Sequence, residues 1–79
     1  MERRSIDEIL PPQSIEAEQA VLGSILIDPG CFGRVKDIIK ADDFYREIHR
    51  IVFDILTKLD RDGTALDFVT ICTALGENL

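Results

Sequence analysis

The fold of this 79-residue chain is decided by residues 16–27, which read Glu-Ala-Glu-Gln-Ala-Val-Leu-Gly-Ser-Ile-Leu-Ile. The first half contains strong helix formers, and Ser14 precedes it as a predicted N-cap. From Val21 onward the apolar side chains cover most of the helix circumference, which is typical of a helix that is buried on nearly all sides. We therefore expect a central helix against which the other segments pack, with Gly23 allowing one of them to approach closely. A short buried strand is the alternative, because periodicity alone does not classify so short an apolar run.

Length and charge restrict the class of protein. Seventy-nine residues make one small domain, and 9 Lys and Arg against 15 Asp and Glu give a net charge of −6 at pH 7. A domain that binds nucleic acid through its phosphates needs a basic face, so we expect protein partners and no direct nucleic-acid binding. No apolar run approaches the roughly 20 residues that span a bilayer, and no signal peptide is present. We therefore expect a soluble cytoplasmic protein that does not bind membranes.

The rest of the chain is expected to form an N-terminal arm and three further helices. Residues 1–13 are expected to form an extended arm, because two prolines at its end forbid a continuous helix, and residues 14–79 are expected to form the helical domain. After a turn at Asp28-Pro29-Gly30, apolar spacing predicts helices over residues 31–39, 45–60 and 68–75. The predicted fold is all-α, a compact orthogonal or antiparallel bundle of about four helices around a buried central helix.

Caps and cysteines add local expectations. Asp42 or Asp43 is expected to cap the helix over residues 45–60, Asp67 to cap the last helix and Gly76 to end it. The apolar face predicted for the last helix consists of Phe68, Ile71, Cys72 and Leu75. Both cysteines of the chain, Cys31 and Cys72, lie beside apolar residues and are expected to be buried free thiols, because their spacing to the single histidine matches no zinc motif.

The helix over residues 45–60 shows the clearest amphipathic pattern. Its apolar residues fall within an arc of about 140°; they are Ile48, Ile51, Val52, Ile55, Leu56 and Leu59. The opposite face carries Arg50, Asp54 and Lys58 at the spacing of i,i+4 ion pairs, which indicates a solvated face. Phe53 lies at the edge of the apolar arc, one turn after His49. These two residues are our candidates for a protein interface, because a large apolar group beside a charged face marks a contact site.

No catalytic set is found in the sequence. A Walker A loop and a nucleophile elbow are both missing, so we expect neither a catalytic nor a cofactor-binding nor a metal site. An acid–base set built from Asp42, Asp43 and His49 is the enzymatic alternative, but a helix cap, a solvated carboxylate and a helix histidine explain these residues more simply. Glu18 points toward the apolar side of its helix, where an arginine is its expected partner. These patterns predict a small acidic helical domain for interaction or assembly.

Several short motifs follow one another in a specific order. They are Pro12, Glu16-Ala17-Glu18-Gln19-Ala20-Val21-Leu22-Gly23, Asp43-Phe44-Tyr45, His49 four residues later, and Asp67 with Thr70. This order, over residues 11–75, resembles the N-terminal domain of bacterial replicative hexameric DNA helicases of the DnaB type. The resemblance implies that Phe44 and Tyr45 anchor the third helix and that Asp67 with Thr70 shapes the start of the last one. The motif residues are therefore expected to mark a fold and not a reaction centre.

The same resemblance implies a function for the parent protein. Such helicases carry a RecA-like ATPase domain that binds ATP and Mg²⁺, and six copies encircle single-stranded DNA and unwind it at the replication fork. Their N-terminal domain forms a collar, contacts neighbouring subunits and recruits primase in the primosome. Without a Walker A motif, this chain is expected to be a fragment truncated before the ATPase domain and to have no enzymatic activity. The alternative is a free-standing acidic helical regulator that binds another protein.

Overall fold

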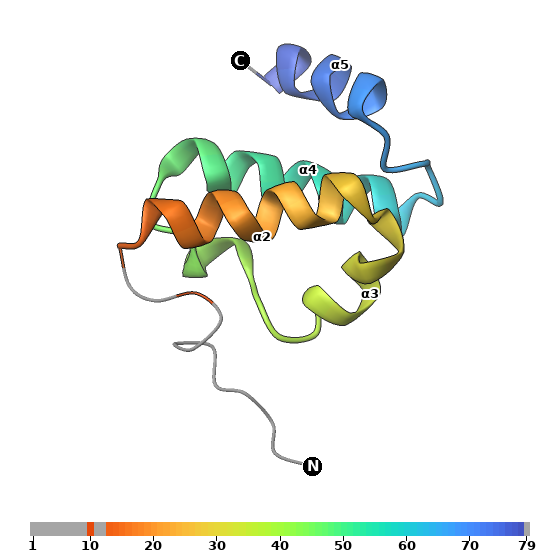
Figure 1. Ribbon diagram of the computed structural model, residues 1–79. Coiled ribbons are helices and arrows are strands. Elements are labelled where there is room, and N and C mark those ends of the chain that lie inside the picture. Colours follow the sequence, from red (N-terminus) through yellow and green to blue (C-terminus); the bar gives the residue numbers. More distant parts are fainter. Residues whose placement is uncertain (1–9, 11–12, 79) are drawn as a thin grey trace.

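The computed structural model describes residue 10 and residues 13–78 (Figure 1). In this part of the chain the elements are α2 (Ile15–Ile27), the 3₁₀ helix η1 (Pro29–Cys31), α3 (Phe32–Val35), the 3₁₀ helix η2 (Ala41–Asp43), α4 (Glu47–Arg61) and α5 (Phe68–Asn78). The described residues contain no strand, so the predicted all-α class is confirmed. No helix among them is both long and apolar enough to cross a membrane.

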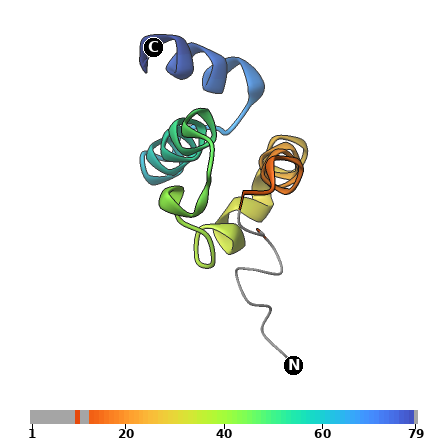
Figure 2. The ribbon, with the colours of Figure 1, turned by 90° about the vertical axis from the view of Figure 1, so that its left-hand side faces the viewer.

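Helix α2 begins as the sequence predicts but is not buried on all sides. The Ser14 hydroxyl accepts a hydrogen bond from the N–H of Ala17 at 3.3 Å, which confirms the N-cap. At the other end, 42% of Leu26 and 87% of Ile27 are exposed, so the expectation of a buried central helix is wrong. The reason is visible in Figure 2, where α2 lies along one side of the molecule and only one of its faces meets the rest of the fold. A Cβ atom at Gly23 would meet no atom within 4 Å, so Gly23 is not a point of close approach either.

Helix α4 is the element on which the others pack. It contacts α2, η2 and α5, and Leu56 at its centre is completely buried. The helix begins at Glu47, two residues later than predicted, and Arg46 occupies the N-cap position without a side-chain cap bond. Neither predicted aspartate caps it, because the Asp43 carboxylate instead accepts the N–H of Lys40 at 2.7 Å and caps η2. The strong amphipathic pattern of the sequence therefore marks the central helix, but that helix is α4.

The core is a continuous set of buried side chains drawn from each α-helix, from the segments between them and from Leu10 before α2. It consists of Leu10, Leu22, Ile25, Phe32, Ile39, Phe44, Phe53, Leu56, Leu66 and Ile71. Aromatic rings form a row through it: the centroid of Phe53 lies 5.4 Å from that of Phe32 and 5.2 Å from that of Phe44. Of the predicted N-terminal arm, only Leu10 and Gln13 belong to the described residues, and Leu10 is 3% exposed.

The segment between α2 and α4 forms less helix than the sequence predicts. The expected helix over residues 31–39 is reduced to η1 and the single turn of α3, after which the N–H of Ile39 donates to the carbonyl of Val35 at 2.8 Å. The chain then becomes extended at Lys40, with φ −117° and ψ 161°. This early end still leaves Phe32 and Ile39 buried, so the predicted apolar face survives in part.

Helix α5 confirms one predicted cap and contradicts the other. The Asp67 carboxylate accepts the N–H of Thr70 at 2.7 Å, as predicted for an N-cap. The helix continues through Gly76 to Asn78, so Gly76 does not end it. Of the predicted apolar face, Ile71 is buried and 63% of Phe68 is exposed.

The two thiols differ from the sequence-based expectation. Both cysteines are free, but Cys31 is half-buried and Cys72 is exposed. The prediction that both are buried is therefore wrong. Cys72 is exposed because α5 has only α4 as a major packing partner.

Candidate functional site: a buried polar junction and two apolar surfaces

The Glu18 carboxylate joins α2 to the start of α4. It is 1% exposed and accepts the backbone N–H groups of Tyr45 at 2.6 Å and Arg46 at 3.3 Å. The Nδ1 atom of His49 lies 2.6 Å from the Glu18 Oε1 atom. Because an ionised carboxylate only accepts hydrogen bonds, Nδ1 carries the proton of this bond. Glu18 thus fixes from α2 the two residues that precede α4 and, through His49, the first turn of α4.

These contacts control the charge of Glu18. Burial alone raises the pKa of this carboxyl group, but the hydrogen bonds from His49, Tyr45 and Arg46 outweigh it and hold the pKa below its ordinary value of 4.5. The carboxylate is therefore ionised near neutral pH. It lies at the N-terminus of α4, where the helix dipole favours a negative charge.

Arg50 holds the same segment from its carbonyl side. Its Nη1 atom donates to the carbonyl oxygens of Phe44 and Tyr45, both at 2.9 Å. The Phe44 ring packs edge-on against the imidazole of His49, with centroids 6.2 Å apart. The bend before α4 is therefore fixed by Glu18 through its N–H groups and by Arg50 through its carbonyl groups. The i,i+4 ion pairs predicted for Arg50, Asp54 and Lys58 do not form among the described residues.

The junction gives several of the motif residues a structural role. Glu18, Phe44 and His49 converge on it, and every buried polar side-chain atom of the described residues has a partner. Tyr45 contributes its backbone while 56% of the residue is exposed. A closed and fully bonded arrangement can hold a helix start in place, but it presents no group to a substrate.

The structure also places the two predicted interface residues inside this region. Phe53 is 2% exposed and His49 is 8% exposed, so the reasoning that made Phe53 an exposed apolar group at the edge of a charged face is wrong. Asp42 and Asp43 are exposed and do not join His49 in an acid–base set, because the partner of His49 is Glu18. The residues that the structure describes contain no group of three His, Cys, Asp or Glu side chains suited to a metal ion.

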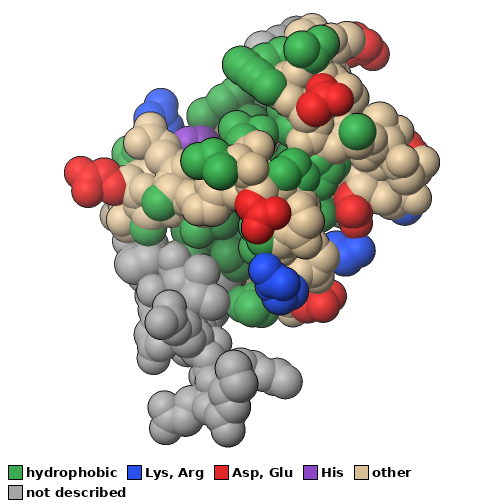
Figure 3. All heavy atoms as spheres, turned by 45° about the vertical axis from the view of Figure 1, so that its right-hand side comes forward, with side chains coloured by type: hydrophobic (Ala, Val, Ile, Leu, Met, Phe, Trp, Pro, Cys, Tyr) green, Lys and Arg blue, Asp and Glu red, His purple; other side chains and the backbone are tan. Residues whose placement is uncertain are grey.

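Large apolar side chains are exposed on α2 and α5 instead. The most exposed on these two helices are Ile27 at 87%, Val69 at 75%, Phe68 at 63% and Leu26 at 42%. Figure 3 shows hydrophobic side chains gathered on the face between α5, at the top, and α2, across the middle. The sequence contains this signal, because the second half of α2 and the start of α5 are more apolar than one buried face requires.

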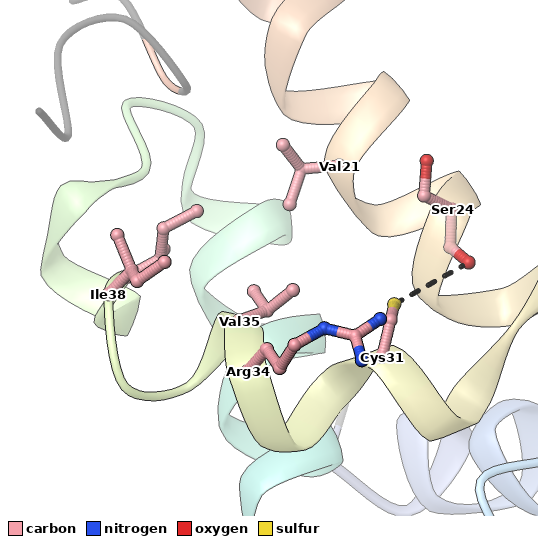
Figure 4. A pocket seen from close by; sticks show the side chains of 7 residues that line it. Val21, Ser24, Cys31, Arg34, Val35 and Ile38 are labelled. Atoms are coloured by element: carbon pink, nitrogen blue, oxygen red, sulfur yellow. Dashed lines mark hydrogen bonds between the residues drawn. The ribbon is translucent and has the colours of Figure 1, made fainter. Parts of the chain in front are cut away.

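A pocket of about 190 Å³ opens between α2 and α3 (Figure 4). Its lining is mostly apolar and consists of Val21, Ser24, Cys31, Arg34, Val35, Ile38 and Ile39. The Cys31 thiol lies 4.0 Å from the carbonyl oxygen of Ser24, and the Arg34 side chain extends toward Cys31 along the pocket. We call this site the α2–α3 pocket.

Arg34 is the one charged residue among those that line the α2–α3 pocket, and the two lysines that follow it in the chain have partners elsewhere. Lys36 pairs with Asp60 at 2.8 Å, and the Lys40 ammonium group donates to the carbonyl of Lys36 at 2.9 Å. Within the described part of the chain, no carboxylate pairs with Arg34. The pocket therefore combines apolar walls with one positive charge at its edge.

Comparisons with known proteins give a consistent result. A family model described as DnaB-like helicase N terminal domain matches residues 10–79. The chain is 44% identical over 69 residues to the replicative DNA helicase DnaB of Pasteurella multocida, covering 87% of this chain and 15% of that protein. It is 41% identical over 68 residues to the protein of the same name from Geobacillus stearothermophilus, covering 86% and 15%, and 39% identical over 69 residues to that of a Nostoc species, covering 87% and 8%. No solved structure gives a significant match.

Proposed function

This chain belongs to the DnaB-like helicase N-terminal domain family, and we propose that it is the assembly and protein-interaction domain of a replicative DNA helicase. The chain spans 15% or less of the length of the three relatives compared above, so the activity named for them is that of much longer proteins. In our proposal the parent protein hydrolyses ATP to unwind DNA at the replication fork. This domain forms a collar on its hexameric ring and recruits primase.

The observation that carries the proposal is the exposure of large apolar side chains on α2 and α5. Ile27 on α2 and Val69 on α5 are 87% and 75% exposed, and large apolar groups gathered on one face mark protein contacts more often than solvated surface. The polar junction around Glu18 agrees with the same interpretation, because it fixes α2 to the start of α4 without offering a reactive group. A preorganised surface binds a partner at a lower entropic cost.

Charge supports protein partners over DNA. The chain carries a net charge of −6 at pH 7, and binding to a phosphate backbone depends on clusters of Lys and Arg. One of these cations, Lys36, is already paired with Asp60. We therefore assign DNA binding to other parts of the parent protein.

The test is a calorimetric titration of the chain against the C-terminal domain of the cognate primase, with sedimentation of each protein alone. We expect a complex that Ile27→Asp weakens at least tenfold, because a carboxylate at the most exposed apolar position disrupts an apolar contact. The matched control is Gln19→Asp, which adds the same charge at an exposed position two turns away on α2. A well-folded chain that binds no primase would show that the primase assignment is wrong.

A further inference from the structure

We propose that Phe68 of one copy of this chain inserts into the α2–α3 pocket of a neighbouring copy, where Asp67 pairs with Arg34. This inference rests on the proposed assembly function and names one contact that would join neighbouring copies. It requires that the inserted group match the pocket in size and charge. It also requires that the two surfaces lie on different sides of the molecule.

The size of the pocket suits an aromatic ring. Its volume is about 190 Å³, and an apolar cavity of about 150 Å³ is large enough to bind benzene. Phe68 is 63% exposed at the start of α5, so its ring is free to enter a cavity on another molecule. The ring would meet the side chains of Val21 and Val35, which are half-buried, and of Ile38, which is exposed.

The charges next to Phe68 and at the pocket are also complementary. Asp67 directly precedes Phe68, and the backbone N–H of Thr70 lowers the pKa of its carboxyl group, which keeps it ionised. Arg34 at the pocket has no carboxylate partner among the described residues. An arginine guanidinium suits a carboxylate because it can donate two parallel hydrogen bonds. Phe68 and Asp67 thus supply next to each other the apolar group and the negative charge that the pocket lacks.

The arrangement of the helices makes the contact intermolecular. Helix α5 lies on the opposite side of α4 from α3, as Figures 1 and 2 both show. Phe68 therefore cannot reach the pocket of its own molecule. A contact between two different surfaces is head-to-tail, and such contacts form a ring when the rotation between copies closes. One aromatic side chain buries about 150–250 Å², so isolated copies should associate weakly, and the parent ring would add avidity.

Disulfide trapping tests the contact, because Cys31 already lines the pocket. In a Cys72→Ser background, Val69→Cys places a thiol beside Phe68 without removing Phe68 or Asp67. A second chain in the same background carries Tyr45→Cys as the control, and Tyr45 is a matched site because it is 56% exposed. After mild oxidation and peptide mapping, we expect at least ten times more disulfide between Cys31 and the introduced thiol of another copy in the Val69→Cys chain than in the control. Equal yields from the two chains would overturn the proposal.

Three further variants separate the ring from the charge. Adding Phe68→Ser to the Val69→Cys chain should lower the yield of this intermolecular disulfide at least fivefold, and an unchanged yield would exclude insertion of the ring. Arg34→Glu should lower the yield about threefold, as expected for an exposed ion pair, and Asp67→Asn, which keeps an N-cap residue at the start of α5, should lower it by a similar factor. An unchanged yield in either variant would exclude the ion pair. The primase titration measures binding to a different protein, so its failure and the failure of this contact are observed separately.

Discussion

Glu18 is a charged residue in an interface that is otherwise apolar. A buried charge is costly unless it is fully hydrogen-bonded, and here two backbone N–H groups and an imidazole satisfy it. The sequence reveals half of this arrangement, because Glu18 shares a helix face with Leu22 and Ile25. It does not reveal the partner, since His49 lies 31 residues away and the sequence predicts an arginine in its place. Only the packing of α2 on α4 brings the two together.

Replacing Glu18 should therefore destabilise the fold strongly. Glu18→Ala leaves two N–H groups and one imidazole without their acceptor, and each buried unsatisfied group costs about 1–3 kcal/mol. We expect a loss of about 3 kcal/mol or more in the free energy of unfolding, measured by urea denaturation with circular dichroism. The control Glu16→Ala, an exposed position on the same helix, should change stability by less than about 0.5 kcal/mol. Equal effects of the two substitutions would contradict the role of Glu18 in fixing the start of α4.

The lowered pKa of Glu18 also predicts how stability depends on pH. A carboxyl group whose pKa is lower in the folded state stabilises the fold above its unfolded pKa, and this stabilisation is lost as the pH falls through the folded pKa. Unfolding free energies should therefore decrease as the pH is lowered below about 4.5, the ordinary value for Glu18. Glu18→Gln, which cannot ionise, should show a shallower decrease over the same range. Parallel pH curves for the two proteins would show that the carboxylate is not stabilised by folding.

At the scale of the elements, the sequence identifies the helices better than their burial. The caps Ser14 and Asp67 are predictable from residue type and position, because both bonds form within three residues. The apolar second half of α2 suggests full burial, but a helix of 13 residues at the side of a small domain has only one face to bury. Helix α4 has the clearer separation of an apolar face from a charged face, and it is the element that α2, η2 and α5 contact.

This difference predicts unequal costs for two similar substitutions. Leu56 is 0% exposed and Leu26 is 42% exposed. Leu56→Ala should cost about 3–5 kcal/mol because it leaves a cavity in the core, whereas Leu26→Ala should cost less than about 1 kcal/mol. Both changes in unfolding free energy are measured by denaturant unfolding, with the same m-value used for the two variants. If Leu26→Ala cost as much as Leu56→Ala, α2 would be the buried central helix that the sequence predicts.

Gly23 allows a stabilising substitution in the same helix. A Cβ atom there meets nothing within 4 Å, and glycine in a helix interior is about 0.5–1 kcal/mol less favourable than alanine. Gly23→Ala should therefore raise the free energy of unfolding by about that amount. The increase is read from the midpoint of thermal or urea unfolding. A decrease would indicate a packing contact at this position.

At the scale of the whole molecule, family membership and fold class are accessible from the sequence, but the free surface is not. The motif order spans nearly the same residues as the family match, which begins at residue 10. Whether Phe53 or Phe68 faces solvent depends on how α4 is enclosed by η2, α2 and α5, and no local pattern encodes that enclosure. That enclosure buries His49 and Phe53, so the exposure assumed for the predicted interface is wrong. The apolar excess of α2 and α5 is visible in the sequence, but its exposure follows only from the assembled fold.

A substitution at Leu10 tests whether this residue unfolds together with the helical core. It precedes α2, belongs to no helix and is 3% exposed within the core cluster. Because a buried leucine contributes through burial and cavity closure whatever its secondary structure, Leu10→Ala should cost about 2–4 kcal/mol in the free energy of unfolding. The control Ile15→Ala, at a position 37% exposed, should cost less than about 1 kcal/mol. An equally small cost at Leu10 would mean that the segment before α2 unfolds separately, and the core would then begin at Ala17 and Leu22 on α2.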